Sequence, residues 1–216
     1  MTTPLTTPLE EQQAAEALVA TGLSLYQRGY TFGTAGNMSV RCGDVVLITP
    51  TNSSFGGLQA EAIARVDRGG KVLGEAVPSK EVPFHLAAYE ADPQTGAVVH
   101  LHSTYATAVS CLRDLDVDDA LPIFTPYFAM RLPRLPVVAY HPPGDPALGA
   151  GVRDRIAGTK AVLLRNHGSI TVGKTLFEAA ALAEELEEQA KLFFLLGGRG
   201  LQLTAAQTAE LRRRFR

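Results

Sequence analysis

Residues 97–102 read Ala-Val-Val-His-Leu-His, a short apolar run that carries two histidines two positions apart. Side chains alternate between the two faces of a strand, so Val99 and Leu101 lie on one face and both imidazoles on the other. The run therefore predicts a buried strand whose two imidazoles are neighbours. Two ring nitrogens placed in this way can chelate one metal ion, although strand histidines also often satisfy only local hydrogen bonds.

Helical and extended patterns alternate on both sides of this strand. Further strands are expected at 45–48, at 64–66 and 71–73 as a hairpin, at 137–140, and at 161–164. Helices are expected from Pro8 to near Gly29, at 78–89, at 103–112, from Pro146, at 176–196 and at 203–216. The proline-rich stretch 121–143 is expected to be largely extended. The alternation predicts an α/β fold in a single domain over residues 1–216.

Composition restricts the class of protein. The chain has 216 residues, a hydrophobic content of 46%, a formal net charge of −2 and a pI near 6.2, so no overall charge favours nucleic acid or an anionic membrane. No apolar run reaches the roughly 20 residues of a membrane span, and residues 1–9 do not resemble a secretory signal. Cys42 and Cys111 form no metal or disulfide motif. We expect a cytoplasmic protein with reduced thiols.

A third metal ligand and an acid–base group have candidates elsewhere in the chain. His167 follows the apolar run 161–164 and precedes Gly168, a position from which a side chain can project into a cleft. Glu81 lies near the start of the helix expected at 78–89, where a carboxylate either complements the helix dipole or serves as a catalytic acid–base. His85, four residues later, shares that helix face, and a structural role is expected for it.

Two polar turns have the composition of an anion site. The stretch 33–39 reads GTAGNMS, in which glycines can expose backbone N–H groups and Asn37 and Ser39 add side-chain donors; a tight turn without a ligand is the alternative. The hydroxyl-rich stretch 49–54 follows a predicted strand and could present donors to the same anion. Ser79 and Lys80 would complete such a site, with a solvated lysine as the alternative for Lys80.

Taken in order, the motifs GTAGNMS, ITPTNSS, PSKE, HLH and NHG resemble those of the class II aldolase/adducin family over most of the chain. The resemblance implies a three-layer α/β/α fold around a central, mostly antiparallel sheet. It also implies a homotetramer with active sites between subunits. In enzymes of this family three histidines hold a divalent metal, and they map onto His100, His102 and His167, with Zn²⁺ expected and Mn²⁺ or Co²⁺ as alternatives. The catalytic carboxylate maps onto Glu81.

The family's phosphate pocket maps onto Asn37, Thr51, Asn52 and Ser79. Lys80 stands where the fuculose-phosphate aldolases have serine, and Asn52 stands where they have glycine. Because asparagine tolerates the left-handed backbone conformation, the turn at Asn52 can be preserved. A cation clamped on a departing carboxylate would stabilise the ground state, so we place Lys80 near the phosphate or the developing enediolate.

Within the family, the segments 78–85, 100–108, 124–127 and 142–146 are similar to those of the 3-oxo-tetronate 4-phosphate decarboxylases. The resemblance implies metal-dependent loss of carbon dioxide from that substrate, giving dihydroxyacetone phosphate through a metal-stabilised enediolate. Glu81 would deliver the proton to the carbon that lost the carboxylate. Tyr127 is a further candidate acid or orienting hydroxyl in the pocket, or else a buried structural tyrosine.

Other functions share the same motifs. A class II aldolase of the fuculose-phosphate type generates the same enediolate from a sugar phosphate and is the first alternative, followed by a sugar-phosphate 4-epimerase. An adducin-like interaction module is the non-enzyme alternative, although such members lack the complete metal set. The expected partner is a phosphorylated sugar-acid substrate, with neither nucleic acid nor membrane.

Overall fold

The computed structural model describes residues 7–215. Its centre is one seven-stranded sheet with strand order β3-β2-β1-β4-β7-β6-β5. The strands are β1 (Asn37–Cys42), β2 (Val45–Ile48), β3 (Ala64–Asp67), β4 (Ala97–Leu101), β5 (Val137–Val138), β6 (Ala161–Leu164) and β7 (Gly168–Gly173). Neighbouring strands are antiparallel except for the β5–β6 pair. The expected mostly antiparallel α/β sheet is confirmed.

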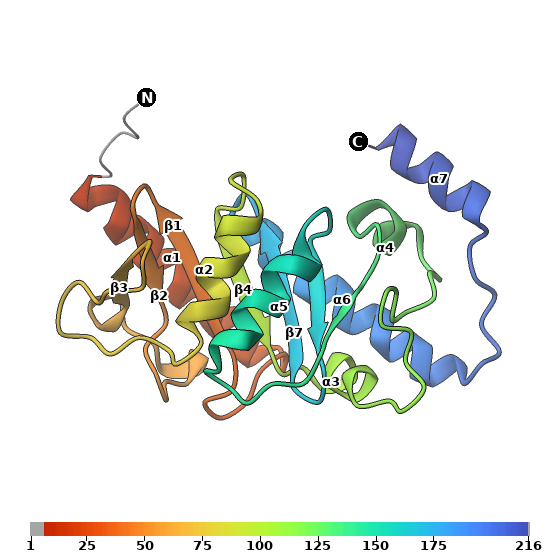
Figure 1. Ribbon diagram of the computed structural model, residues 1–216, viewed down its shortest axis with the longest axis horizontal. Helices are drawn as coiled ribbons and strands as arrows, with labels where there is room; N and C mark the ends of the chain where they lie inside the picture. The colour runs from red at the N-terminus through yellow and green to blue at the C-terminus, as the bar shows by residue number, and fades with distance from the viewer. Residues whose placement is uncertain (1–6, 216) are drawn as a thin grey trace.

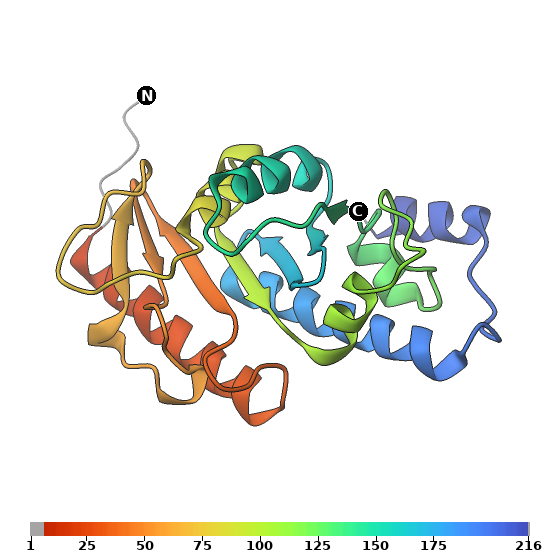
Figure 2. The same ribbon diagram turned by 60° about the horizontal axis from the view of Figure 1, so that its bottom comes forward.

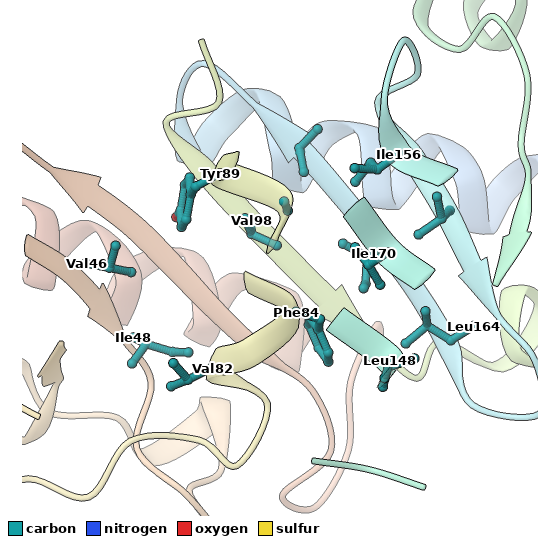
Figure 3. Packing of buried hydrophobic residues seen from close by; sticks show 14 of the residues in the cluster. Val46, Ile48, Val82, Phe84, Tyr89, Val98, Leu148, Ile156, Leu164 and Ile170 are labelled. Atoms are coloured by element: carbon teal, nitrogen blue, oxygen red, sulfur yellow. The ribbon is translucent and has the colours of Figure 1, made fainter. Parts of the chain in front are cut away.

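Helices cover both faces of this sheet (Figures 1 and 2). Helices α1 (Pro8–Gln27) and α6 (Leu176–Leu196) lie on one face, and α2 (Val82–Ala91) and α5 (Pro146–Ile156) lie on the other. Figure 3 shows the core between α2, α5 and the sheet, where Phe84 and Leu148 from the helices meet Val98 and Ile170 from the strands. The molecule is therefore a three-layer α/β/α structure, as the resemblance implies.

Local sequence signals define the ends of the longest helices. The Thr7 side chain accepts from the Glu10 backbone N–H and the Glu10 carboxylate accepts from the Thr7 N–H, which forms a capping box at the start of α1. Thr175 caps α6 through the Glu178 N–H, and Gly197 ends α6 in the left-handed conformation that glycine adopts without steric cost. The predicted bounds of α6 are confirmed.

Three shorter helices complete the fold: α3 (Thr104–Ser110), α4 (Pro126–Arg131) and α7 (Ala205–Arg214), with 3₁₀ turns η1 (Phe55–Gly57) and η2 (Ala60–Ala62). Helix α7 lies against α4, where the Arg212 guanidinium donates to the carbonyl oxygens of Ala129, Leu132 and Pro133. Among residues 7–215, no helix combines the length and the apolar character that crossing a bilayer requires.

Several expected elements differ in the structure. The helix expected at 78–89 begins only at Val82, because residues 78–79 are held in an extended bridge to residues 49–50. The segment 71–73 contributes only an isolated bridge to β3, so the expected hairpin has one true strand. The stretch 121–143 is not wholly extended: α4 forms where Thr125 caps the Phe128 N–H and Pro126 occupies the first helical position.

Two strands were absent from the prediction. Strand β1 begins at Asn37, inside a stretch whose glycines indicated only a turn, and β7 follows directly on the turn at His167. Ser103 precedes α3, but within the described part of the chain its hydroxyl makes no capping hydrogen bond. The sheet joins strands from residues 37 to 173 in one layer, and the single domain over residues 1–216 stays a prediction.

Candidate active site

Three histidines converge at one end of the sheet. His100 is on β4, His102 directly follows that strand, and His167 lies in the tight turn between β6 and β7. Their ligand nitrogens all lie within 4.8 Å of one another, and the ring centroids are 4.7–4.9 Å apart. The sequence therefore identified side chains that the fold brings to a common centre.

The fold fixes how one of these rings is protonated. His100 Nδ1 lies 2.9 Å from the carbonyl oxygen of Ser169 on β7 and donates to it, which leaves a lone pair on Nε2. A backbone acceptor behind a ligating histidine orients the ring and selects its tautomer in this way. The Nε2 atoms of His100 and His102 lie 2.8 Å apart and face the same point.

The surroundings keep all three rings neutral. Burial lowers the pKa of His100 well below its usual value, and the neighbouring His102 and His167 lower it further. Burial is also the main cause that lowers the pKa of His102 and of His167, while Glu81 opposes it. Neutral imidazoles are the form that binds a metal ion, and three of them leave coordination positions for a substrate. The three residues therefore fit a divalent metal.

Glu81 lies against this cluster. It is the N-cap residue of α2, and its side chain is buried beside the imidazoles. Oε1 lies 3.4 Å from Nε2 of His167, and Oε2 lies 3.4 Å from Nε2 of His100. A carboxylate in this position can exchange a proton with a molecule held at the histidines, so the arrangement favours the acid–base interpretation over a solvated helix-dipole partner.

A cavity of about 180 Å³ opens beside Glu81, His102 and His167. Every residue that the resemblance places in the phosphate pocket lines it: Asn37, Thr51, Asn52, Ser79 and Lys80. The bridge between Pro50 and Pro78, reinforced by the hydrogen bond from Ser79 N to Thr49 O, brings the loops that carry these residues together. The cavity can thus hold an anionic group next to the histidine cluster.

Backbone conformation at this cavity matches the sequence expectation. Asn52 adopts φ 56°, the left-handed conformation expected where the aldolases have glycine. Gly36 has φ 84°, and a Cβ there would lie 2.7 Å from the His100 carbonyl oxygen. The close approach of residue 36 to β4 explains why glycine is needed just before Asn37.

Asn37 has a second set of contacts. Its Nδ2 donates to Glu81 Oε2 over 2.7 Å, and its Oδ1 lies 2.5 Å from Nε2 of His85. His85 is fully buried, and burial, together with the neighbouring His100 ring, lowers its pKa to about 3. The expected structural role of His85 therefore includes a connection to Glu81. Ser39 points away from the cavity toward His85, so it is not part of an anion-binding turn.

Tyr127 does not occupy the position expected for it. Its side chain is on α4, 64% exposed, and the cavity beside Glu81 is lined by other residues of the chain. The alternative of a buried structural tyrosine is wrong, and the role of an acid or orienting hydroxyl stays a prediction. Helix α4 forms inside the segment 121–143 and turns this residue to the surface.

Sequence reasoning missed two groups, one that contacts a histidine of the cluster and one that lies further from it. The carbonyl of Ser169 and the side chain of Tyr89 have no motif of their own, and both act through contacts between elements distant in sequence. Only the helical spacing of Glu81, His85 and Tyr89 could have indicated that they share one face.

Comparison with known proteins identifies the family to which the chain belongs. The family model described as "Class II Aldolase and Adducin N-terminal domain" matches residues 16–194. The 3-oxo-tetronate 4-phosphate decarboxylase of Pectobacterium atrosepticum is 49% identical over 203 residues, 93% of each chain. The L-fuculose phosphate aldolase of Methanococcus maripaludis strain C7 is 37% identical, over 80% of this chain and 91% of that protein.

Solved structures agree with these sequence matches. The crystal structure of YgbL from Escherichia coli superposes with a TM-score of 0.91 at 45% identity, covering 94% of this chain and 99% of that one. An L-fuculose 1-phosphate aldolase structure gives a TM-score of 0.86 at 30% identity, covering 94% and 96%. Matches of this extent place the chain in one family, and the protein is a member of the class II aldolase and adducin family.

Proposed function

We propose that this protein is a metal-dependent carbon–carbon lyase that converts 3-oxo-tetronate 4-phosphate to dihydroxyacetone phosphate and carbon dioxide. The observation that carries the proposal is the buried Glu81 carboxylate, which lies 3.4 Å from two of three clustered imidazoles at the edge of a polar cavity. The decarboxylase relative that is 49% identical over nearly the whole chain supports the choice of substrate.

The histidine cluster would hold the metal. Imidazoles of His100, His102 and His167 would bind a divalent ion, for which we propose Zn²⁺ because three neutral nitrogen donors suit it. When bound, such an ion supplies Lewis acidity at the ketone oxygen next to the bond that breaks.

The cavity residues would bind and orient the substrate. Lys80 supplies a positive charge, and the side chains of Thr51, Asn52 and Ser79 supply donors for the phosphate group. One proton of the Asn37 amide is engaged by Glu81, and the other remains for the phosphate. Asn37 would therefore contact both the substrate and the carboxylate.

Glu81 would supply the proton. When the bond to the carboxyl carbon breaks, carbon dioxide leaves and its electron pair remains on the substrate as an enediolate. Glu81 carries a proton on Oε1 when the bond breaks, and transfer of that proton to the enediolate carbon forms the new C–H bond and yields dihydroxyacetone phosphate; the carboxylate regains a proton from solvent before the next turnover. Because Glu81 is only 7% exposed, bulk water has little access to this proton.

A sugar-phosphate aldolase is the second candidate, supported by the fuculose-phosphate aldolase relatives and by the shared enediolate. Lys80 favours the decarboxylase because a substrate with both carboxylate and phosphate is more anionic than a sugar phosphate. We also propose a homotetramer with active sites between subunits. An exposed Tyr127 is available to another subunit's site in such an assembly. Cytoplasmic location stays a prediction.

Product analysis tests the proposal. Zinc-loaded protein is incubated separately with 3-oxo-tetronate 4-phosphate and with L-fuculose 1-phosphate. We expect carbon dioxide and dihydroxyacetone phosphate in equal amounts from the first, and little cleavage of the second. Efficient release of an aldehyde from L-fuculose 1-phosphate, without decarboxylation of 3-oxo-tetronate 4-phosphate, would contradict the proposal. Glu81→Gln should reduce turnover by about 100-fold or more.

A further inference from the structure

A chain of buried polar side chains extends from Glu81 into the layer between α2 and the sheet. Asn37 Nδ2 donates to Glu81 Oε2 over 2.7 Å, and Asn37 Oδ1 lies 2.5 Å from His85 Nε2. Ser39 Oγ lies 2.7 Å from His85 Nδ1 and 2.8 Å from the Tyr89 hydroxyl. We call Asn37, His85, Ser39 and Tyr89 the Glu81 relay.

The relay follows from the periods of the two elements that carry it. Asn37 and Ser39 are two residues apart on β1, so they share a face of the strand. Glu81, His85 and Tyr89 are four residues apart at the start of α2 and along it, so they share a face of the helix. Packing these faces together alternates strand and helix residues along one line of hydrogen bonds. Figure 3 shows Tyr89 at the far end, between α2 and the sheet.

The donors and acceptors in the Glu81 relay allow its hydrogen bonds to run in only one direction. Oε2 accepts whether Glu81 is ionised or carries a proton on Oε1, so Asn37 presents its NH₂ group to Glu81 and its carbonyl oxygen to His85. His85 Nε2 must then carry the proton, which leaves Nδ1 as an acceptor for the Ser39 hydroxyl. Ser39 Oγ in turn accepts from Tyr89. Burial raises the pKa of Tyr89, which keeps this terminal donor protonated.

The two carboxylate oxygens of Glu81 therefore differ. Oε2 accepts from the Asn37 amide nitrogen, which has no lone pair with which to take a proton in return. Oε1 is buried, has no hydrogen-bond partner among residues 7–215, and lies 3.4 Å from His167 Nε2. Of the two oxygens, only Oε1 is free to exchange a proton with a bound molecule.

We propose that His85, Ser39 and Tyr89 are positioning residues that act through Asn37 to anchor Glu81 Oε2, so that Oε1 is the oxygen that exchanges the proton with substrate. The proposal rests on the acid–base role given to Glu81 in the proposed function. It assigns a task to buried polar groups that neither contact the cavity nor belong to the histidine cluster.

Kinetics of matched serine variants provide the first test. Ser39→Ala and Ser110→Ala each remove one buried hydroxyl, but the contacts of the Ser110 hydroxyl are local, with the Thr107 carbonyl and the Cys111 thiol. For Ser39→Ala we expect kcat about tenfold lower or more, with KM within about twofold, because the carboxylate is misplaced while substrate binding is retained. Ser110→Ala should keep kcat. Equal kcat values in the two variants would overturn the proposal.

A conservative replacement of His85 distinguishes a positioning role from a role in packing alone. Glutamine at residue 85 retains an amide N–H that can donate to Asn37 Oδ1, whereas alanine retains none. His85→Gln should therefore recover part of the kcat that His85→Ala loses, and Tyr89→Phe should give a smaller loss than either. A His85→Gln variant no better than His85→Ala, when both are folded, would contradict the assigned donor.

The tautomer of His85 can be measured in the wild-type protein, with one variant used only to assign the His85 signal. In zinc-loaded wild-type protein labelled with ¹⁵N-histidine, long-range ¹H–¹⁵N correlation spectra report which ring nitrogen carries the proton. We expect the Nε2–H form for the His85 signal, identified by its shift in Tyr89→Phe. An Nδ1–H form would mean that the hydrogen bonds of the relay run in the opposite direction, and it would overturn the proposal. The spectrum does not depend on turnover. If the protein proved inactive, the proposed reaction would be refuted, and the spectrum would still decide whether the hydrogen bonds of the relay run as proposed.

Discussion

His100 donates its Nδ1 proton to the carbonyl oxygen of Ser169, 2.9 Å away on the adjacent strand. Strands β4 and β7 are paired so that Leu101 lies opposite Ser169, which places this carbonyl behind the imidazole. The orientation of a metal ligand therefore depends on the register and spacing of two strands. A substitution that disturbs the β4–β7 contact should therefore weaken metal binding, even though every ligand residue is retained.

Gly168→Ala tests this dependence. A Cβ at residue 168 would overlap the Leu101 carbonyl oxygen and would lie 3.3 Å from Cδ2 of His102. We expect β7 to move away from β4, with a loss of about 1–3 kcal/mol in the free energy of unfolding and weaker zinc binding. Chemical denaturation and zinc titration measure both effects. Gly57→Ala is the control because a Cβ at residue 57 meets no atom within 4 Å. Equal zinc affinity in the two variants would contradict the dependence.

Removal of a ligand should abolish stable metal binding. We expect wild-type protein to retain about one ion per chain after dialysis, and His100→Ala and His167→Ala to retain almost none, because the remaining nitrogens cannot complete the site. Elemental analysis measures the ratio. His141→Ala, which changes a histidine outside the cluster, should retain the ion. A His167→Ala variant with undiminished metal would remove His167 from the ligand set.

The histidine cluster could be predicted because its signals are local. The two-residue spacing of His100 and His102 fixes their common face, and His167 stands in a recognisable strand-ending turn. The cavity loops were likewise indicated by their hydroxyl and amide side chains, and Asn52 adopts the backbone conformation expected for it. Short-range geometry and the family resemblance were sufficient for these features.

The remaining features depend on packing between distant segments. Ser39 looked like an anion donor, yet its strand faces α2 and directs the hydroxyl to His85 and Tyr89. The prolines around Tyr127 predict an extended chain, whereas the Thr125 cap and Pro126 start helix α4 there, which is a local signal. The direction of Ser39 is set by contacts with α2 that residue type and spacing do not encode.

His85 should make stability depend on pH. Its pKa is about 3 in the folded protein, against about 6.5 when unfolded. Above pH 6.5 the ring is neutral in both states and contributes no pH dependence. Between pH 6.5 and 3 the unfolded chain binds a proton that the folded protein does not, so stability falls as pH falls, by up to about 1.4 kcal/mol per pH unit.

Urea unfolding of chelator-treated protein between pH 5 and 7 measures this slope. In His85→Gln we expect the change in unfolding free energy per pH unit to be smaller by the contribution of about one bound proton. This expectation holds whatever the absolute stability of the variant. His141→Gln should leave the slope close to that of wild type. The other buried imidazoles are present in all three proteins, so their contributions cancel in the comparison. An unchanged slope in His85→Gln would mean that the folded protein tolerates a charge at residue 85.

Lys80 should act mainly on substrate binding. Its ammonium group is exposed at the cavity that we assign to the phosphate, so Lys80→Gln removes a charge–charge contact that is partly screened by water. We expect KM for the phosphorylated substrate to rise about tenfold and kcat to change less, consistent with one lost hydrogen bond to a charged group. Steady-state kinetics at two ionic strengths measure this, and the wild-type KM should rise with salt more steeply than that of the variant. Lys71→Gln, which changes an exposed lysine outside the cavity, should match wild type. A large fall in kcat at constant KM would instead place the ammonium group against the charge that develops in the transition state.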